Sequence, residues 1–300
     1  MLRIVGGEIA EARIMLHGSP RAGEVRAAKL VSAGIPALAS DGTCEFLLPK
    51  GAAAVTEGAA LRIEVTREAI PGSEPWKRPL ARAADEPIRA APMAHSEPLP
   101  FPATDDRLER AGWSDLLDEA RSRVVRFAGG ELRVSPTPAM TLIDVDGSLP
   151  PVELALAGAR AAASAVLRHG IGGSIGIDLP TISGKAQRQA VAEAIDAVLP
   201  QPFERTAMNG FGFLQIVRPR RYASTFELAQ DRAAFEARAL LRRTAVEPSG
   251  GKCLVVHPAV ATVLESNEGW IDALARQVGG AVTLRSDPSL PIHGSYAEKS

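Results

Sequence analysis

The chain has 300 residues, of which 46% are hydrophobic, and a formal net charge of −1, which is long enough for two or three small domains with their own cores. The balanced charge argues against a dedicated nonspecific nucleic-acid binder, so any such contact must come from local basic clusters. The two cysteines, Cys44 and Cys253, are far apart in the sequence, which excludes a disulfide framework and a cysteine-rich zinc site. We find no signal peptide and no apolar run long enough to span a bilayer, so we expect a cytoplasmic protein with no membrane partner.

Residues 1–69 are predicted to form a small β-rich barrel. Apolar or alternating runs, each about the length of a strand, are separated by glycines, as expected for strands joined by turns. The runs cover 2–5, 8–16, 24–31, 36–39, 44–48 and 60–65.

Proline marks 70–104 as a linker, because a residue with a fixed φ and no backbone N–H is poorly tolerated inside packed elements. The prolines are Pro71, Pro75, Pro79, Pro87, Pro92, Pro98, Pro100 and Pro102. Next, the apolar spacing predicts a helix over 105–126.

The stretch 105–222 is predicted to be an α/β core. Strand-like runs at 139–147, 173–180 and 210–217 alternate with helix-like segments at 151–170 and 184–199. This β-α-β-α-β order is typical of a sheet with crossover helices.

Two of these strands end in carboxylates. Because side chains alternate between the faces of a strand, Asp144 and Asp146 share one face, and Asp178 would lie beside Asp144 if the two strands were neighbours. Close carboxylates repel unless a proton or cation lies between them, and Mg²⁺ binds one or two carboxylates together with waters and phosphate oxygens. The pattern indicates a Mg²⁺ site for phosphodiester chemistry; alternatively, Asp-Gly is an ordinary turn and Asp178 marks a strand end.

Three blocks of the core follow one another as 127–147 (FAGGELRVSPTPAMTLIDVDG), 172–178 (GGSIGID) and 209–220 (NGFGFLQIVRPR). In order and spacing they resemble the catalytic core of the ribonuclease E/G family. The resemblance implies that Asp144 and Asp178 hold a catalytic Mg²⁺. The family has asparagine at the position of Asp146, where the aspartate keeps an oxygen ligand for the metal and adds a negative charge.

The resemblance extends to the N-terminal region, where the family carries an OB-fold RNA-binding barrel. Cys44–Pro49 and Gly58–Glu68 resemble two of its strands. This implies an RNA-stacking position for Phe46, although a barrel also needs apolar filling and the alternative is a core residue. The segment before the core is too short for the family's domain that senses the 5′ end of RNA, so we expect that domain to be absent.

Basic residues of the core are candidates for RNA phosphate contacts. Arg218, Arg220 and Arg221 follow the third strand and match a basic end in the family's block. Lys185 and Arg188 lie in the first two turns of the helix 184–199, where they reach either substrate phosphate or only solvent.

Residues 223–300 are predicted to form a small C-terminal α/β domain. Ser224 and Glu227 form a capping box for a helix to about 243, followed by strands at 252–256 and 281–285, helices at 257–264 and 270–278, and a loose tail from 287. The cysteine-containing zinc link that the family carries before this domain is missing, so neither structural zinc nor a homo-oligomer is indicated.

We therefore expect an α+β protein with an OB-like barrel, an α/β nuclease core and a small C-terminal α/β domain. The resemblance implies a Mg²⁺-dependent endoribonuclease that hydrolyses single-stranded RNA and leaves a 5′-phosphate. The alternative is a catalytically degenerate module that binds RNA or a protein partner. A structural protein with no RNA role is a third possibility, for which no Mg²⁺-dependent binding is expected.

Overall fold

The structure is a computed structural model that describes residues 1–71, 77–93, 96–99 and 105–299. It is a mixed α+β structure that contains a closed barrel and several sheets. The chain forms two compact units, Met1–Ser96 with Ala111–Glu227 and Glu97–Arg110 with Leu228–Ser300. Within the described ranges, no helix combines the length and the apolar composition needed to cross a bilayer.

The first unit begins with a hairpin and a closed barrel. β1 (Leu2–Val5) pairs with β2 (Glu8–Ala12) outside the barrel. Gly6 and Gly7 form the tight turn with φ values of 61° and 89°, which residues other than glycine rarely adopt. The barrel has the strand order β3-β4-β5-β7-β6, with β3 (Val25–Ser32), β4 (Ala37–Ser40), β5 (Glu45–Leu48), β6 (Ala60–Arg67) and β7 (Leu80–Ala83).

The barrel extends beyond the predicted boundary at residue 69. β7 pairs with β5 on one side and with β6 on the other, so the linker prediction is wrong for Leu80–Ala83. The physical reason is that a sheet closes only when a further strand covers both of its open edges. Parts of the predicted linker, 72–76, 94–95 and 100–104, lie outside the described residues.

The same unit contains a six-stranded sheet in the order β12-β13-β11-β10-β9-β8. β10 (Thr141–Gly147) and β11 (Gly173–Asp178) are parallel and joined by α3 (Pro151–Arg168), as predicted. The other pairings are antiparallel. These strands are β8 (Val124–Phe127), β9 (Gly130–Pro136), β12 (Glu204–Arg205) and β13 (Phe213–Arg218), and α4 (Lys185–Asp196) precedes β12.

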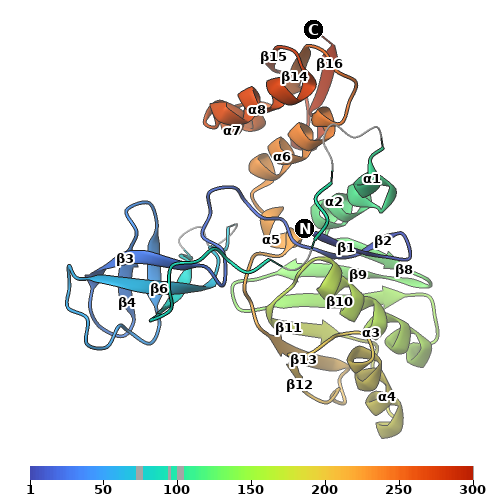
Figure 1. The fold of residues 1–300 in the computed structure, drawn as a ribbon. Helices are drawn as coiled ribbons and strands as arrows, with labels where there is room; N and C mark the ends of the chain where they lie inside the picture. Colours follow the sequence, from blue (N-terminus) through green and yellow to red (C-terminus); the bar gives the residue numbers. More distant parts are fainter. Residues whose placement is uncertain (72–76, 94–95, 100–104, 300) are drawn as a thin grey trace. The chain divides into compact units, whose positions relative to one another are not determined.

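The helices α3 and α4 lie side by side along one face of this sheet (Figure 1). On that face Ile143, Val145, Ile175 and Ile177 are buried among the alanines of α3. α3 packs closely against β10 at Gly158, where an added Cβ would lie 2.3 Å from Val145 Cγ1. Alternation then turns the even-numbered side chains of β10 to the opposite face, where Leu142 is 39% exposed.

The predicted helix over 105–126 is interrupted. It consists of α1 (Arg107–Arg110) and α2 (Trp113–Ser122), separated by Gly112 at a φ of 89°. The remaining residues enter β8, because Arg123 adopts a left-handed conformation that ends α2.

The second unit is built on a three-stranded sheet in the order β15-β14-β16, with β14 (Lys252–Val256), β15 (Val282–Ser286) and β16 (Tyr296–Lys299). Its longer helices are α6 (Arg232–Ala245), α7 (Pro258–Glu265) and α8 (Glu268–Val278), and η1 (Ile292–Gly294) precedes β16. The prediction of a loose tail is wrong, since β16 pairs along β14. The predicted capping box forms, with Ser224 and Glu227 bonded reciprocally, but it opens only the short helix α5 (Thr225–Leu228).

Candidate functional site

Two aspartates meet at the carboxyl ends of the parallel strands. Asp144 of β10 is paired directly with Asp178 of β11, and adjacent strands are roughly 4.8 Å apart. Both side chains are exposed, on the face of the sheet opposite α3 and α4. The predicted meeting of Asp144 and Asp178 is confirmed.

The electrostatics of this pair favour a cation. Partial burial raises the pKa of Asp144, and the negative charges of Asp146 and Asp178 raise the pKa further, against the opposing effect of Arg133. A raised carboxyl pKa means that the ionised form is disfavoured in the structure as it stands. A bound cation would remove that penalty.

A neighbouring antiparallel strand adds two charges that the sequence analysis did not identify. Arg133 of β9 is paired with Asp144, and Glu131 with Asp146. The Arg133 guanidinium lies 2.6 Å from Glu131 Oε1 and 4.0 Å from Asp146 Oδ2. The sequence signal was the alternation of buried Leu132 and Val134 with these polar residues, which is typical of a half-exposed strand.

The three predicted metal ligands, Asp144, Asp146 and Asp178, do not form one metal-binding group among the described residues. In the part of the chain that the structure describes, no group of three or more His, Cys, Asp or Glu could hold a metal ion. Asp146 instead borders a shallow hollow with Glu131, Arg133 and Ser148. Asp144 and Asp178 remain as two adjacent carboxylates, a donor set that fits Mg²⁺ if waters or phosphate oxygens complete its coordination.

The arginines at and after the end of β13 lie at the opposite ends of the strands from the aspartates. Because β13 is antiparallel to β11, Phe213 is paired with Asp178, whereas Arg218 is paired with Gly173. Five residues of strand separate these positions, which is roughly 17 Å. Burial lowers the pKa of Arg218, and Arg220 forms an ion pair with Glu227. Arg218, Arg220 and Arg221 therefore do not form a phosphate-contact patch beside the aspartates.

The basic residues at the start of α4 have different environments. Arg188 Nη1 donates hydrogen bonds to the backbone carbonyls of Ile182 at 2.9 Å and Ser183 at 2.7 Å. It therefore holds the loop that follows β11. Lys185 is exposed and remains a candidate for phosphate contact.

Phe46 is a core residue of the barrel. Its side chain is fully buried among Leu30, Leu48 and Ile63. The stacking position implied by the resemblance is therefore not available in this structure, because the face of the ring is covered by protein atoms.

An exposed aromatic residue that the sequence analysis did not single out lies in the loop that leads into the strand beside Asp178. Phe211, at the loop before β13, is 86% exposed, and Phe213 two residues later is paired with Asp178. The available signal was the Gly-Phe-Gly sequence after Asn209, which is typical of a turn.

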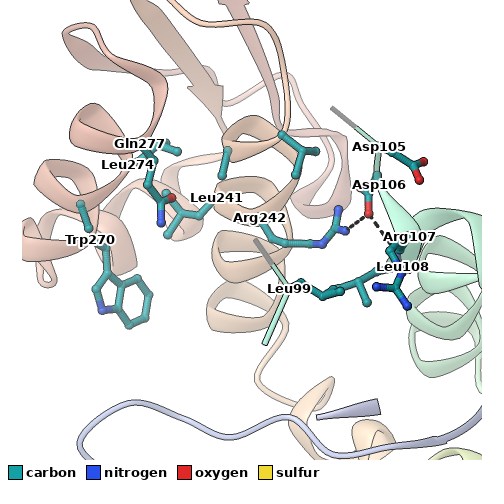
Figure 2. Close-up of a pocket in the computed structure, with 13 residues that line it drawn as sticks. Leu99, Asp105, Asp106, Arg107, Leu108, Leu241, Arg242, Trp270, Leu274 and Gln277 are labelled. Atoms are coloured by element: carbon teal, nitrogen blue, oxygen red, sulfur yellow. Dashed lines mark hydrogen bonds and ion pairs between the residues drawn. The ribbon is translucent and has the colours of Figure 1, made fainter. Parts of the chain in front are cut away.

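The second unit contains a hydrophobic cavity of about 480 Å³. Figure 2 shows Leu241 and Arg242 of α6 opposite residues 105–108, with Trp270 and Leu274 of α8 on another side. A hydrogen bond of 2.5 Å from Arg242 lowers the pKa of Asp106. No His, Cys or Ser of the described residues lines the cavity. The cavity could accommodate an apolar group, and of the two carboxylates among its described lining residues Asp106 is bonded to Arg242, so the aspartate pair is the better candidate for chemistry.

Comparisons with known proteins do not identify the chain: no family model matches it, and no curated protein matches it.

Proposed function

We propose that this chain is a Mg²⁺-dependent endoribonuclease that hydrolyses phosphodiester bonds in single-stranded RNA. The observation that carries the proposal is the direct pairing of Asp144 with Asp178 at the exposed carboxyl ends of two parallel strands. The resemblance of the three sequence blocks to the ribonuclease E/G family supports the same site.

In this proposal Asp144 and Asp178 hold the metal. When bound, Mg²⁺ supplies an activated water and stabilises negative charge on the phosphate. The protein supplies a fixed pair of carboxylates, since the two aspartates are paired on adjacent strands of the same sheet. Arg133 offsets part of the negative charge that Asp146 adds.

A catalytically degenerate module that binds RNA or a protein partner is the second candidate. It is favoured by the departure of Asp146 from the family's asparagine and by the fact that no three-residue metal cluster is found among the described residues. The two candidates differ in one respect, since only the nuclease cuts RNA.

The test is cleavage of an end-labelled, A/U-rich single-stranded RNA in Mg²⁺ or in EDTA. Wild type is compared with Asp144→Asn and Asp178→Asn, which keep the side-chain volume and remove one ligand charge each. Asp272→Asn, at an exposed position of α8, is the matched control. Circular dichroism establishes that each variant is folded.

The nuclease proposal requires Mg²⁺-dependent cleavage that both site variants abolish and the control retains. Binding without cleavage by wild type would leave the degenerate module. If wild type neither cuts nor binds RNA, the nuclease and the RNA-binding module are both refuted, and only a module that binds a protein partner is left.

A further inference from the structure

An aromatic ring is exposed to water in the loop that leads into β13, the strand paired with the one that carries Asp178. Single exposed apolar residues are common on protein surfaces and need no explanation by themselves. Phe211 differs because the loop that carries it is fixed by hydrogen bonds at both ends.

The loop is built around Asn209. Its side-chain oxygen accepts the backbone N–H of Phe211 at 2.9 Å and that of Phe213 at 3.0 Å. The backbone N–H of Asn209 in turn bonds the carbonyl of Phe213 at 2.9 Å. These bonds restrict the backbone on both sides of Phe211, so little conformational entropy is left to lose when its ring binds a ligand.

The loop is also tied to the segment that follows Asp178. The backbone N–H of Leu179 donates to the carbonyl of Gly212 at 3.1 Å, and Thr181 Oγ1 donates to that of Phe211 at 3.2 Å. Gly212 has a φ of 97°, and an added Cβ would lie 2.1 Å from the Leu179 carbonyl oxygen. Only glycine allows this approach, which fixes the position of Phe211 relative to the strand end that carries Asp178.

A second ring extends the apolar surface onto the sheet. A Cβ added at Gly176 would lie 2.6 Å from Phe213 Cζ and 3.0 Å from Leu142 Cδ2. Phe213 therefore lies over the glycine, next to the partly exposed Leu142, and is separated from Asp144 by β11. The surface beside the carboxylates is thus aromatic and aliphatic.

We propose that Phe211 is a base-stacking residue, which binds the nucleobase of a single-stranded RNA next to the phosphodiester at Asp144 and Asp178. This inference rests on the proposed function. A nucleobase fits because it offers a flat π-face within one nucleotide of a phosphate, and the aspartates beside the ring require a cation-bound, anionic group rather than an apolar protein surface.

The test measures RNA binding by the full chain in EDTA, where the proposed nuclease does not cut. The probes are fluorescein-labelled A/U-rich oligonucleotides, each with one abasic nucleotide at a different position. Wild type is compared with Phe211→Ala, Phe211→Trp and the control Val217→Ala, which removes an exposed apolar side chain from the other end of β13. Cleavage in Mg²⁺ is measured in parallel.

We expect Phe211→Ala to weaken binding about tenfold, since a stacked base contributes a factor of roughly 5 to 150 in affinity. Phe211→Trp and Val217→Ala should bind as wild type does. One abasic position should weaken wild type but not Phe211→Ala, because the two changes remove the same contact.

Equal binding by Phe211→Ala and wild type, with cleavage retained, would overturn the stacking inference and leave the nuclease intact. Weakened binding of the variant with no cleavage by wild type would support stacking in a non-catalytic binder. A change in sedimentation of Phe211→Ala without a change in RNA affinity would assign the ring to a contact between copies of the chain and overturn the inference. If wild type neither binds RNA in EDTA nor cuts it in Mg²⁺, both proposals are refuted.

Discussion

The substitution Gly158→Ala tests how closely α3 packs on the strand that carries the aspartates. In the helix alone, alanine in place of glycine should stabilise the fold by roughly 0.5–1 kcal/mol. In the structure the added Cβ would lie 2.3 Å from Val145 Cγ1, which is far inside van der Waals contact. Relieving such an overlap in a close-packed core costs roughly 1–3 kcal/mol. The clash should therefore outweigh the propensity, with a net loss of about 1 kcal/mol.

The assay is thermal unfolding followed by circular dichroism, in which about 1 kcal/mol shifts the midpoint of a unit of this size by roughly 2–4 °C. Gly269→Ala in α8 is the matched control, because no atom lies within 4 Å of its added Cβ. The control should unfold at the same temperature as wild type or higher. If Gly158→Ala is as stable as the control, the inferred contact between α3 and β10 is wrong.

Three further substitutions test other parts of the structure. Burial lowers the pKa of His169, which contacts Thr225 and Glu119. The unfolded chain therefore binds a proton more readily at this residue, and the free energy of unfolding should fall as the pH drops through about 6.5. Urea titrations at pH 7.5 and 5.5 should give a smaller difference in that free energy for His169→Gln than for wild type, and an unchanged difference would refute this assignment. Phe46→Ala should destabilise the barrel by roughly 3–5 kcal/mol, whereas a surface stacking residue would leave the denaturation midpoint unchanged. Asp231 accepts the Ala234 N–H at 3.2 Å as the N-cap of α6, so Asp231→Ala should cost about 1 kcal/mol, and an equal loss for Asp231→Asn would show that capping is not the cause.

The sequence predicts the aspartate pair because its two determinants are local. Alternation along β10 fixes which side chains share a face, and the long alanine-rich helix between the two strands favours a parallel crossover. These two features predict parallel strands with Asp144 and Asp178 on one face, and the structure adds the register that pairs the two residues.

The direction of β13 is not encoded locally, so the sequence alone does not say at which end of the sheet the arginine cluster lies. The segment between α4 and β13 is long enough to enter the sheet from either end. The structure uses the antiparallel direction, with Arg218 beside Gly173. The same apolar run in the parallel direction would have placed its basic end near Asp178.

The environment of Phe46 could not be decided from its own strand. In Glu45-Phe-Leu-Leu48 the apolar residues are consecutive, so a period of two does not identify the inner face. Closure by β7 settles it, since Phe46 and Leu48 point into the barrel interior. The closing strand is a four-residue segment flanked by prolines, which gives a weak local signal.

Two charged residues near the aspartate pair, Asp146 of β10 and Arg133 of β9, have opposite effects on the pKa of Asp144. Where the resembled family has asparagine, Asp146 adds a negative charge that raises the pKa of Asp144. Arg133 is paired across the strand with Asp144 and lies 4.0 Å from Asp146, and its positive charge acts on the pKa of Asp144 in the opposite direction. An extra carboxylate near a metal-binding pair is therefore partly offset within the same sheet. Because of this offset, an aspartate at position 146 is compatible with the activity proposed for Asp144 and Asp178.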